Sequence, residues 1–207
     1  MSLLSESGSR PGHEVDAALL RRVAARDRHA VGELYARHQR SLYRYLCQVT
    51  ADDGLAEEVL QDTIVAAWQG AGSFEGRSTV HTWLFAIARR QAHNAMRRRG
   101  LLLADDDALD AVVDPGPGPE ERLLRQDDIE ALTLALSRLS LIHREVLVLN
   151  FLNGLTYQEI AAVLDVPIGT VRSRLSNAKR ALRAVLLDAR AYGAAPSPSA
   201  PTKGPSR

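Results

Sequence analysis

The sequence predicts an all-α protein with two small helical domains, joined by a flexible acidic linker, and a helix-turn-helix in the C-terminal domain. Three observations predict this fold. Stretches rich in Ala, Leu, Arg and Glu carry apolar residues at helical spacing, and alternating runs of the strand type are absent. Residues 114–119 hold three prolines and two glycines, which cannot continue a helix and so divide the sequence into two blocks. Hydrophobic residues make up 45% of the 207 positions, enough for buried cores.

The first helical block is expected over residues 14–100. It lies after a tail of residues 1–13, which, like the C-terminal tail of residues 189–207, is rich in Ser, Gly or Pro and predicted to be disordered. Apolar stripes predict four helices in the block, over residues 15–26, 30–50, 55–68 and 80–99. The third helix leaves an acidic stripe exposed, made of Glu57, Glu58, Gln61 and Asp62.

Charge is segregated along the chain, although the net charge is only +1. The last turns of the fourth helix carry a basic block of Arg89, Arg90, Arg97, Arg98 and Arg99. The following segment, residues 101–126, is acidic and is expected to be an exposed linker that avoids DNA between two basic domains. Its run of three aspartates, residues 105–107, is the one dense carboxylate cluster, and a linker offers it no rigid scaffold for a metal ion.

The second block, residues 127–188, ends in two helices separated by a short turn. Thr156 and Glu159 have the spacing of a capping box at the start of the first helix. Pro167 and the glycine two residues later break that helix, and the second helix is expected to begin near Thr170. This pattern predicts a helix-turn-helix, which makes DNA the first partner to consider.

The outward face of the second helix is polar and basic, and it comprises Arg172, Ser173, Ser176, Asn177, Lys179 and Arg180. Residues 172–183 hold five basic side chains and no acidic one, whereas a solvated helix usually mixes both signs. The imbalance favours a surface that faces phosphates. The alternative is that these residues are the solvated side of an amphipathic helix.

Several kinds of site are not expected. Cys47 is the single cysteine, so an intramolecular disulfide or a cysteine-rich zinc site is excluded, and a reducing cytosol fits. No stretch approaches the roughly 20 apolar residues of a membrane span, and the N-terminus lacks the features of a signal peptide. The chain is therefore predicted to be cytoplasmic, with no membrane insertion, no cofactor, no metal and no catalytic residues.

With these elements in place, the chain resembles bacterial RNA polymerase sigma factors of the extracytoplasmic-function type, which keep only the second and fourth conserved regions. The motifs that carry the resemblance lie in this order along the chain: residues 56–68, 74–76, 82–89, 154–164 and 169–175. The resemblance implies a sigma factor that binds core polymerase, directs it to specific promoters and helps to open the minus-ten element. It also implies control by an anti-sigma factor.

The resemblance further assigns roles to residues. The helix over residues 55–68 is expected to bind the clamp helices of the largest polymerase subunit through Glu58, Gln61 and Asp62, and the flap region is a further polymerase contact. Capture of a flipped minus-ten base is expected from Phe74, Ser78, Arg90, Asn94, Arg97 and Arg98. Recognition of the minus-35 element is expected from Arg172, Ser173, Ser176, Asn177, Lys179 and Arg180. Val80 and Arg90 depart from the residues common in the family at these positions.

Two other functions stay open on the sequence. A stand-alone helix-turn-helix regulator would use the same DNA-binding module, and its first domain would sense a ligand or dimerise. That function would leave the acidic stripe and the first basic block unexplained. A recombinase or nuclease would need a nucleophilic Ser or Tyr beside several arginines, or a carboxylate cluster for Mg²⁺.

Overall fold

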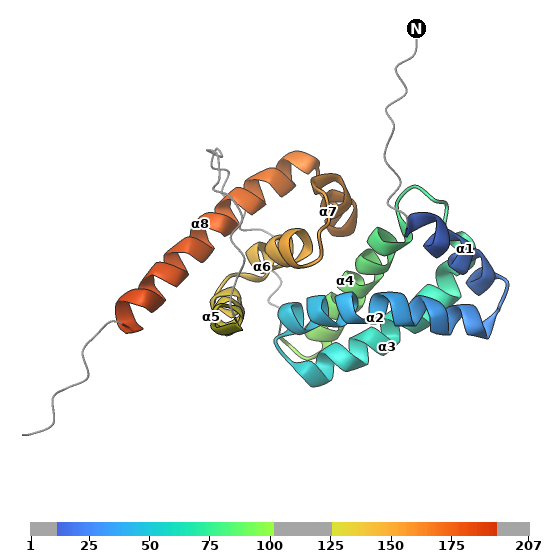
Figure 1. Ribbon diagram of the computed structural model, residues 1–207, viewed down its shortest axis with the longest axis horizontal. Coiled ribbons are helices and arrows are strands. Elements are labelled where there is room, and N and C mark those ends of the chain that lie inside the picture. The colour runs from blue at the N-terminus through green and yellow to red at the C-terminus, as the bar shows by residue number, and fades with distance from the viewer. Residues whose placement is uncertain (1–11, 102–125, 194–207) are drawn as a thin grey trace, which may run out of the picture.

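The computed structural model describes residues 12–101 and 126–193, and within these ranges it contains helices, turns and bends but no strand (Figure 1). The all-α prediction is confirmed, and the helices form two groups that match the two expected blocks. The acidic linker, its aspartate run and most of both predicted tails lie outside the described residues.

The first group comprises α1 (His13–Ala24), α2 (Arg28–Thr50), α3 (Asp53–Gly70), a 3-10 turn (Ala71–Ser73) and α4 (Val80–Arg98). Three of these helices begin at a side-chain cap. Asp27 accepts a hydrogen bond from the His29 backbone N–H at 2.9 Å, Asp52 from Leu55 at 2.8 Å and Thr79 from Thr82 at 3.0 Å. Each cap satisfies a donor that lacks a partner within the helix.

The second group comprises α5 (Gln126–Ser137), α6 (Leu141–Leu147), a π-helical turn (Val148–Leu152), α7 (Tyr157–Leu164) and α8 (Ile168–Gly193). The predicted capping box is confirmed: Thr156 Oγ1 accepts from the Glu159 N–H at 3.3 Å, and Glu159 Oε2 accepts from the Thr156 N–H at 2.8 Å. Asp165, with a φ of 55°, ends α7 in the left-handed region.

Helix α8 is longer than the sequence pattern indicates. It begins two residues before Thr170 and continues to Gly193, so the first five residues of the predicted C-terminal tail, 189–193, are helical. This stretch holds the strong helix formers Ala189, Arg190 and Ala191, and the next proline comes only at Pro196. In Figure 1 the C-terminal half of α8, in orange to red, extends away from the other helices.

The two groups are in direct contact. Helix α7 packs against α4, and α6 and the π-helical turn pack against α2 (Figure 1). Apolar side chains of both groups join one buried cluster, which includes Tyr45, Leu46 and Phe85 from the first group and Val146 and Leu149 from the second. The flexible linker predicted from the sequence did not require the two groups to be in contact. This contact determines the relative position of the surfaces described below.

Candidate nucleic-acid interface and acidic helix face

The acidic helix face consists of Glu58, Gln61 and Asp62 on α3, and all three side chains are exposed. The opposite side of α3 is buried in the first group, where Leu55, Ala56, Val59, Leu60 and Thr63 lie. The predicted separation of an apolar side and an acidic side is therefore present in the structure. It leaves carboxylates available to a partner.

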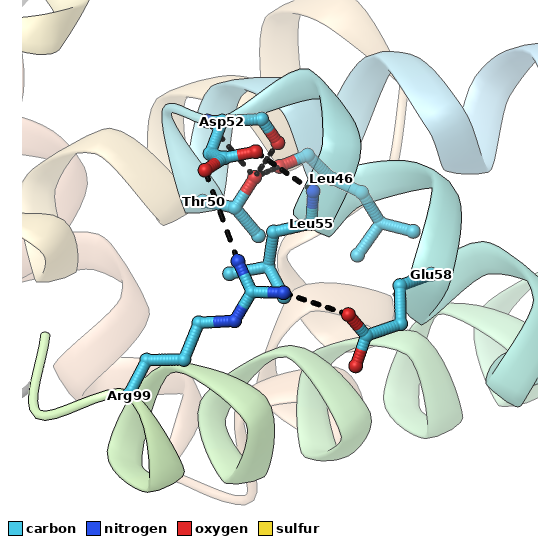
Figure 2. A network of polar contacts seen from close by, with 6 residues as sticks. All are labelled: Leu46, Thr50, Asp52, Leu55, Glu58 and Arg99. Atoms are coloured by element: carbon cyan, nitrogen blue, oxygen red, sulfur yellow. Dashed lines mark hydrogen bonds and ion pairs between the residues drawn. The ribbon is translucent and has the colours of Figure 1, made fainter.

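One member of this face is engaged by an arginine that follows α4. Arg99 Nη2 donates to Glu58 Oε2 at 2.7 Å, and Arg99 Nη1 lies 3.8 Å from Asp52 Oδ2 (Figure 2). The other Asp52 oxygen caps α3, and the Thr50 hydroxyl bonds to the Asp52 carbonyl oxygen at 2.9 Å. The network joins the end of α4 to the start of α3. Among the described residues, Gln61 and Asp62 have no such contact.

The loop before α4 places Phe74 and Ser78 at the N-terminal end of that helix. Phe74 is half-buried, and its ring centroid lies 5.3 Å from that of Trp83. Ser78 is half-buried and bonds to the Thr79 carbonyl oxygen at 3.3 Å. Trp83 is itself half-buried and packs against the core. Phe74 and Trp83 thus form an aromatic pair at the start of α4.

The remaining predicted minus-ten residues line one exposed side of α4 as Arg90, Asn94, Arg97 and Arg98. At about 1.5 Å per residue, Arg97 lies roughly 25 Å along the helix axis from Val80, the first residue of α4. The structure therefore does not gather the loop and these arginines into one pocket.

The predicted minus-35 residues lie near the start of α8. Arg172, Lys179 and Arg180 are exposed, and Ser173, Ser176 and Asn177 are half-buried. Arg180 Nη2 donates to Asn177 Oδ1 at 2.8 Å, and Lys179 Nζ lies 5.3 Å from the centre of the Phe151 ring. Ser173 bonds to the Thr170 carbonyl oxygen at 3.0 Å. The exposed cations mark this side of α8 as basic.

Arg174 does not belong to the basic side. Its exposed fraction is 7%, so it faces the interior of the second group. The count of five basic residues over 172–183 therefore overstated the outward charge by one. Helical spacing explains the error, because position 174 lies next to the buried Ala178 and Val171 on the wheel and the long arginine stem can cover apolar surface.

A buried charged cluster joins the two helix groups, and the sequence pattern did not indicate it. Glu145 on α6 has an exposed fraction of 2%. Its carboxylate accepts from Tyr45 Oη at 3.1 Å, His93 Nε2 at 2.8 Å and Arg89 Nε at 3.3 Å. Burial alone would raise the pKa of Glu145, but the hydrogen bond with His93 and the charge of Arg89 hold it below its usual value. The signal for this cluster in the sequence was one acidic residue, Glu145, directly before the apolar run over residues 146–149.

Other kinds of site are not found in the part of the chain that the structure describes. No group of three or more His, Cys, Asp or Glu side chains there could hold a metal ion. None of the helices within the described ranges is long and apolar enough to cross a membrane.

Comparison with known families matches both helix groups. The Sigma-70 region 2 family matches residues 34–101, and the Sigma-70 region 4 family matches residues 129–182. The RNA polymerase sigma-H factor of Pseudomonas aeruginosa is 34% identical over 179 residues, which cover 82% of this chain and 92% of that protein. The ECF RNA polymerase sigma-E factor of Escherichia coli K12 is 31% identical over 176 residues, covering 81% and 92%.

The chain belongs to the RNA polymerase sigma factors of the extracytoplasmic-function type. Two solved structures are similar to this sigma factor. CnrH in complex with the cytosolic domain of CnrY has a TM-score of 0.63 and 27% identity, covering 84% of this chain and 97% of that one. RpoE of Bartonella quintana in complex with the anti-sigma factor NepR has a TM-score of 0.59 and 29% identity, covering 75% and 96%.

The acidic helix face and the exposed side of α4 lie in region 2 of this sigma factor, and the basic side of α8 lies in region 4. The Glu145 cluster joins region 4 to region 2.

Proposed function

We propose that this sigma factor binds core RNA polymerase, directs it to specific promoters and helps to open their minus-ten element. The observation that supports the proposal best is the separation of exposed charge. Region 2 carries carboxylates on α3 and arginines on α4, whereas region 4 carries cations on α8. Basic surfaces attract DNA phosphates, and an acidic surface repels them and suits a protein partner.

The roles proposed for individual residues are those that the family resemblance implies. Glu58, Gln61 and Asp62 bind the clamp helices of the largest polymerase subunit, and region 4 contacts the flap. Phe74 and the exposed side of α4 hold the unpaired minus-ten strand by stacking and phosphate contacts. The basic side of α8 enters the major groove at the minus-35 element, where Arg172 is suited to guanine and Asn177 to adenine.

We also propose that this sigma factor acts in the cytoplasm, where it meets polymerase and chromosome, and that it is a binding factor and not an enzyme. Control by an anti-sigma factor is proposed by analogy with RpoE of Bartonella quintana, whose solved structure contains its anti-sigma factor NepR.

In vitro transcription with purified core polymerase tests the proposal. Core enzyme supplied with this protein should start RNA synthesis at discrete sites on genomic templates of the source organism, and core enzyme alone should not. Absence of defined start sites on every template would overturn the proposal. A stand-alone helix-turn-helix regulator would instead protect specific DNA from nuclease digestion without core polymerase, so a footprint with and without core separates the two functions.

A further inference from the structure

The last turn of α4 lies beyond the buried part of that helix. Met96 is the last buried residue, and the residues that follow it, 97–101, are exposed. The helix closes on Gly100, which has a φ of 67° and donates its N–H to the Arg97 carbonyl oxygen at 3.1 Å. The Leu101 N–H donates to the Met96 carbonyl oxygen at 2.9 Å. Such backbone bonds hold a helix end weakly, because terminal turns open at little cost in free energy.

Arg99 is the one side chain of this exposed turn that bonds to another helix within the described part of the chain. Its guanidinium lies between two carboxylates near the start of α3, with Nη2 2.7 Å from Glu58 Oε2 and Nη1 3.8 Å from Asp52 Oδ2 (Figure 2). The planar fork of an arginine suits this bridging position, because its two terminal nitrogens point toward different acceptors. Arg99 therefore attaches the last turn of α4 to α3.

The attachment point on α3 is itself fixed. The second carboxylate oxygen of Asp52 caps α3 by accepting from the Leu55 N–H at 2.8 Å. The Thr50 hydroxyl lies 2.9 Å from the carbonyl oxygens of Leu46 and of Asp52. The end of α2, the start of α3 and the end of α4 thus meet at one corner, which polar contacts hold together (Figure 2).

The same turn carries two of the arginines proposed to contact minus-ten DNA. At about 100° per residue, the Arg97 side chain leaves the helix about 200° from that of Arg99, on the side that faces away from α3. Arg97 and Arg98 are both exposed. Because Arg99 is the contact that holds this turn from outside α4, the directions of Arg97 and Arg98 depend on how firmly it is attached.

Glu58 also belongs to the proposed polymerase contact, and one carboxylate can serve both partners. A carboxylate offers about four acceptor positions. Arg99 occupies Oε2 of Glu58. The other oxygen can accept from a donor on polymerase, so the binding of core does not require the release of Arg99.

We infer that Arg99 is a positioning residue for promoter DNA: it anchors the last turn of α4 to α3 and so holds Arg97 and Arg98 toward the minus-ten strand. Arg99 acts through these neighbours and needs no DNA contact of its own. The inference rests on the proposed function, which supplies the DNA strand. Glu58 thereby connects the polymerase-facing side of region 2 with its DNA-facing side.

Hydrogen exchange followed by mass spectrometry on the full-length free protein tests the anchor without any activity. In Glu58→Ala, the amides of residues 97–101 should exchange about two- to fivefold faster, the change expected for the loss of an exposed ion pair. Glu57→Ala is the matched control, because it removes the same charge from the preceding position of α3, where the side chain lies near Tyr43 of α2. It should leave the exchange of residues 97–101 unchanged.

Fluorescence anisotropy with purified holoenzyme tests the consequence for DNA. The probe is a fork template whose unpaired strand carries a minus-ten sequence mapped in the transcription assay. Glu58→Ala holoenzyme should bind this template about two- to fivefold more weakly than wild-type holoenzyme. Charge alone predicts the opposite sign, because the loss of a carboxylate reduces the repulsion of phosphates. Glu57→Ala holoenzyme should therefore bind as tightly as the wild type or more tightly.

Arg99→Lys provides a second variant that leaves the acidic helix face intact, so holoenzyme assembly does not depend on the loss of Glu58. It keeps the positive charge but lacks the fork that reaches two carboxylates. Exchange of residues 97–101 should become faster and binding to the fork template weaker, each to a smaller degree than in Glu58→Ala.

The anchor is ruled out if residues 97–101 exchange equally in Glu58→Ala and Glu57→Ala. The positioning role is ruled out if Glu58→Ala and Arg99→Lys holoenzymes bind the fork template as tightly as the wild type does. Failure of the wild-type holoenzyme to bind any fork template would instead refute the proposed function, and the DNA role of Arg99 with it. The exchange experiment on the free protein keeps these failures distinguishable.

Discussion

Glu58 on α3 and Glu145 on α6 both accept from an arginine of the α4 segment, but their surroundings are opposite. Glu58 is exposed, and its ion pair with Arg99 faces water (Figure 2). Glu145 is buried and accepts from three side chains of the other region. Water screens the first pair and is excluded from the second. An exposed carboxylate can therefore exchange its partner, whereas the buried one can do so only if two regions move apart.

The largest expected effect concerns the exposed acidic helix face on α3. The double substitution Gln61→Ala with Asp62→Arg places a positive charge on the acidic helix face and should abolish association with core polymerase. Both side chains are exposed and make no contact that holds the fold together. Co-purification with core enzyme, or analytical gel filtration of the mixture, measures the loss.

Glu14→Arg on α1 is the control for this experiment, because it reverses an exposed charge outside the acidic helix face. It should bind core normally. If the double variant co-purified with core as well as the control does, the acidic helix face would not be the polymerase contact.

The second prediction compares the two glutamates directly. Glu145→Ala should lower the free energy of unfolding by about 3 kcal/mol, because Arg89 and His93 lose their buried partner. Glu58→Ala should lower it by less than about 1 kcal/mol, as is usual for an exposed ion pair. Urea unfolding followed by circular dichroism measures both. Equal losses would mean that burial does not distinguish these two sites.

A third prediction sharpens the contrast between base recognition and phosphate attraction on α8. Arg172→Ala should weaken binding to the minus-35 element by about 1–3 kcal/mol and relax specificity at one base pair. Arg183→Ala, further along α8, should weaken binding equally for all sequences. Fluorescence anisotropy with a panel of single-base variants, using holoenzyme, measures both. An equal loss on every sequence for Arg172→Ala would make Arg172 a phosphate contact.

The smallest expected effect is the pH dependence of stability at His81 on α4. Burial lowers the pKa of His81 from 6.5 to about 4, with a smaller contribution from the neighbouring His38, and nearby Glu159 and Asp16 act in the opposite direction. The folded pKa lies below the unfolded one, so stability is complete above about pH 6.5 and is lost as the pH falls toward 4. Between about pH 7 and pH 5.5 the loss from this group should be about 1 kcal/mol.

Urea unfolding at a series of pH values measures this slope. His81→Gln should flatten it, and His29→Gln on the exposed side of α2 is the matched control. An unchanged slope in His81→Gln would show that other groups, such as the buried pair His38 and Asp16, set the acid sensitivity.

Features with a local cause could be predicted from the sequence. The capping box at Thr156 and the exposed side of α3 follow from contacts or periodicity within a few residues. The end of α8 was predicted less well, because composition near a terminus is compatible with several helix ends. The burial of Arg174 was also missed, because a long side chain can reach either the solvent or the interior. The roles of the individual DNA-facing residues stay predictions.

By itself, the sequence determined an all-α chain, two helical groups and the positions of the exposed acidic and basic stripes. The reason is that the apolar period of an amphipathic helix depends only on residues close together along the chain. Only the tertiary structure decided that α7 lies against α4 and that Glu145 meets Tyr45, Arg89 and His93. Those residues lie between 52 and 100 positions from Glu145, and no local pattern relates side chains that far apart until the two regions are brought into contact.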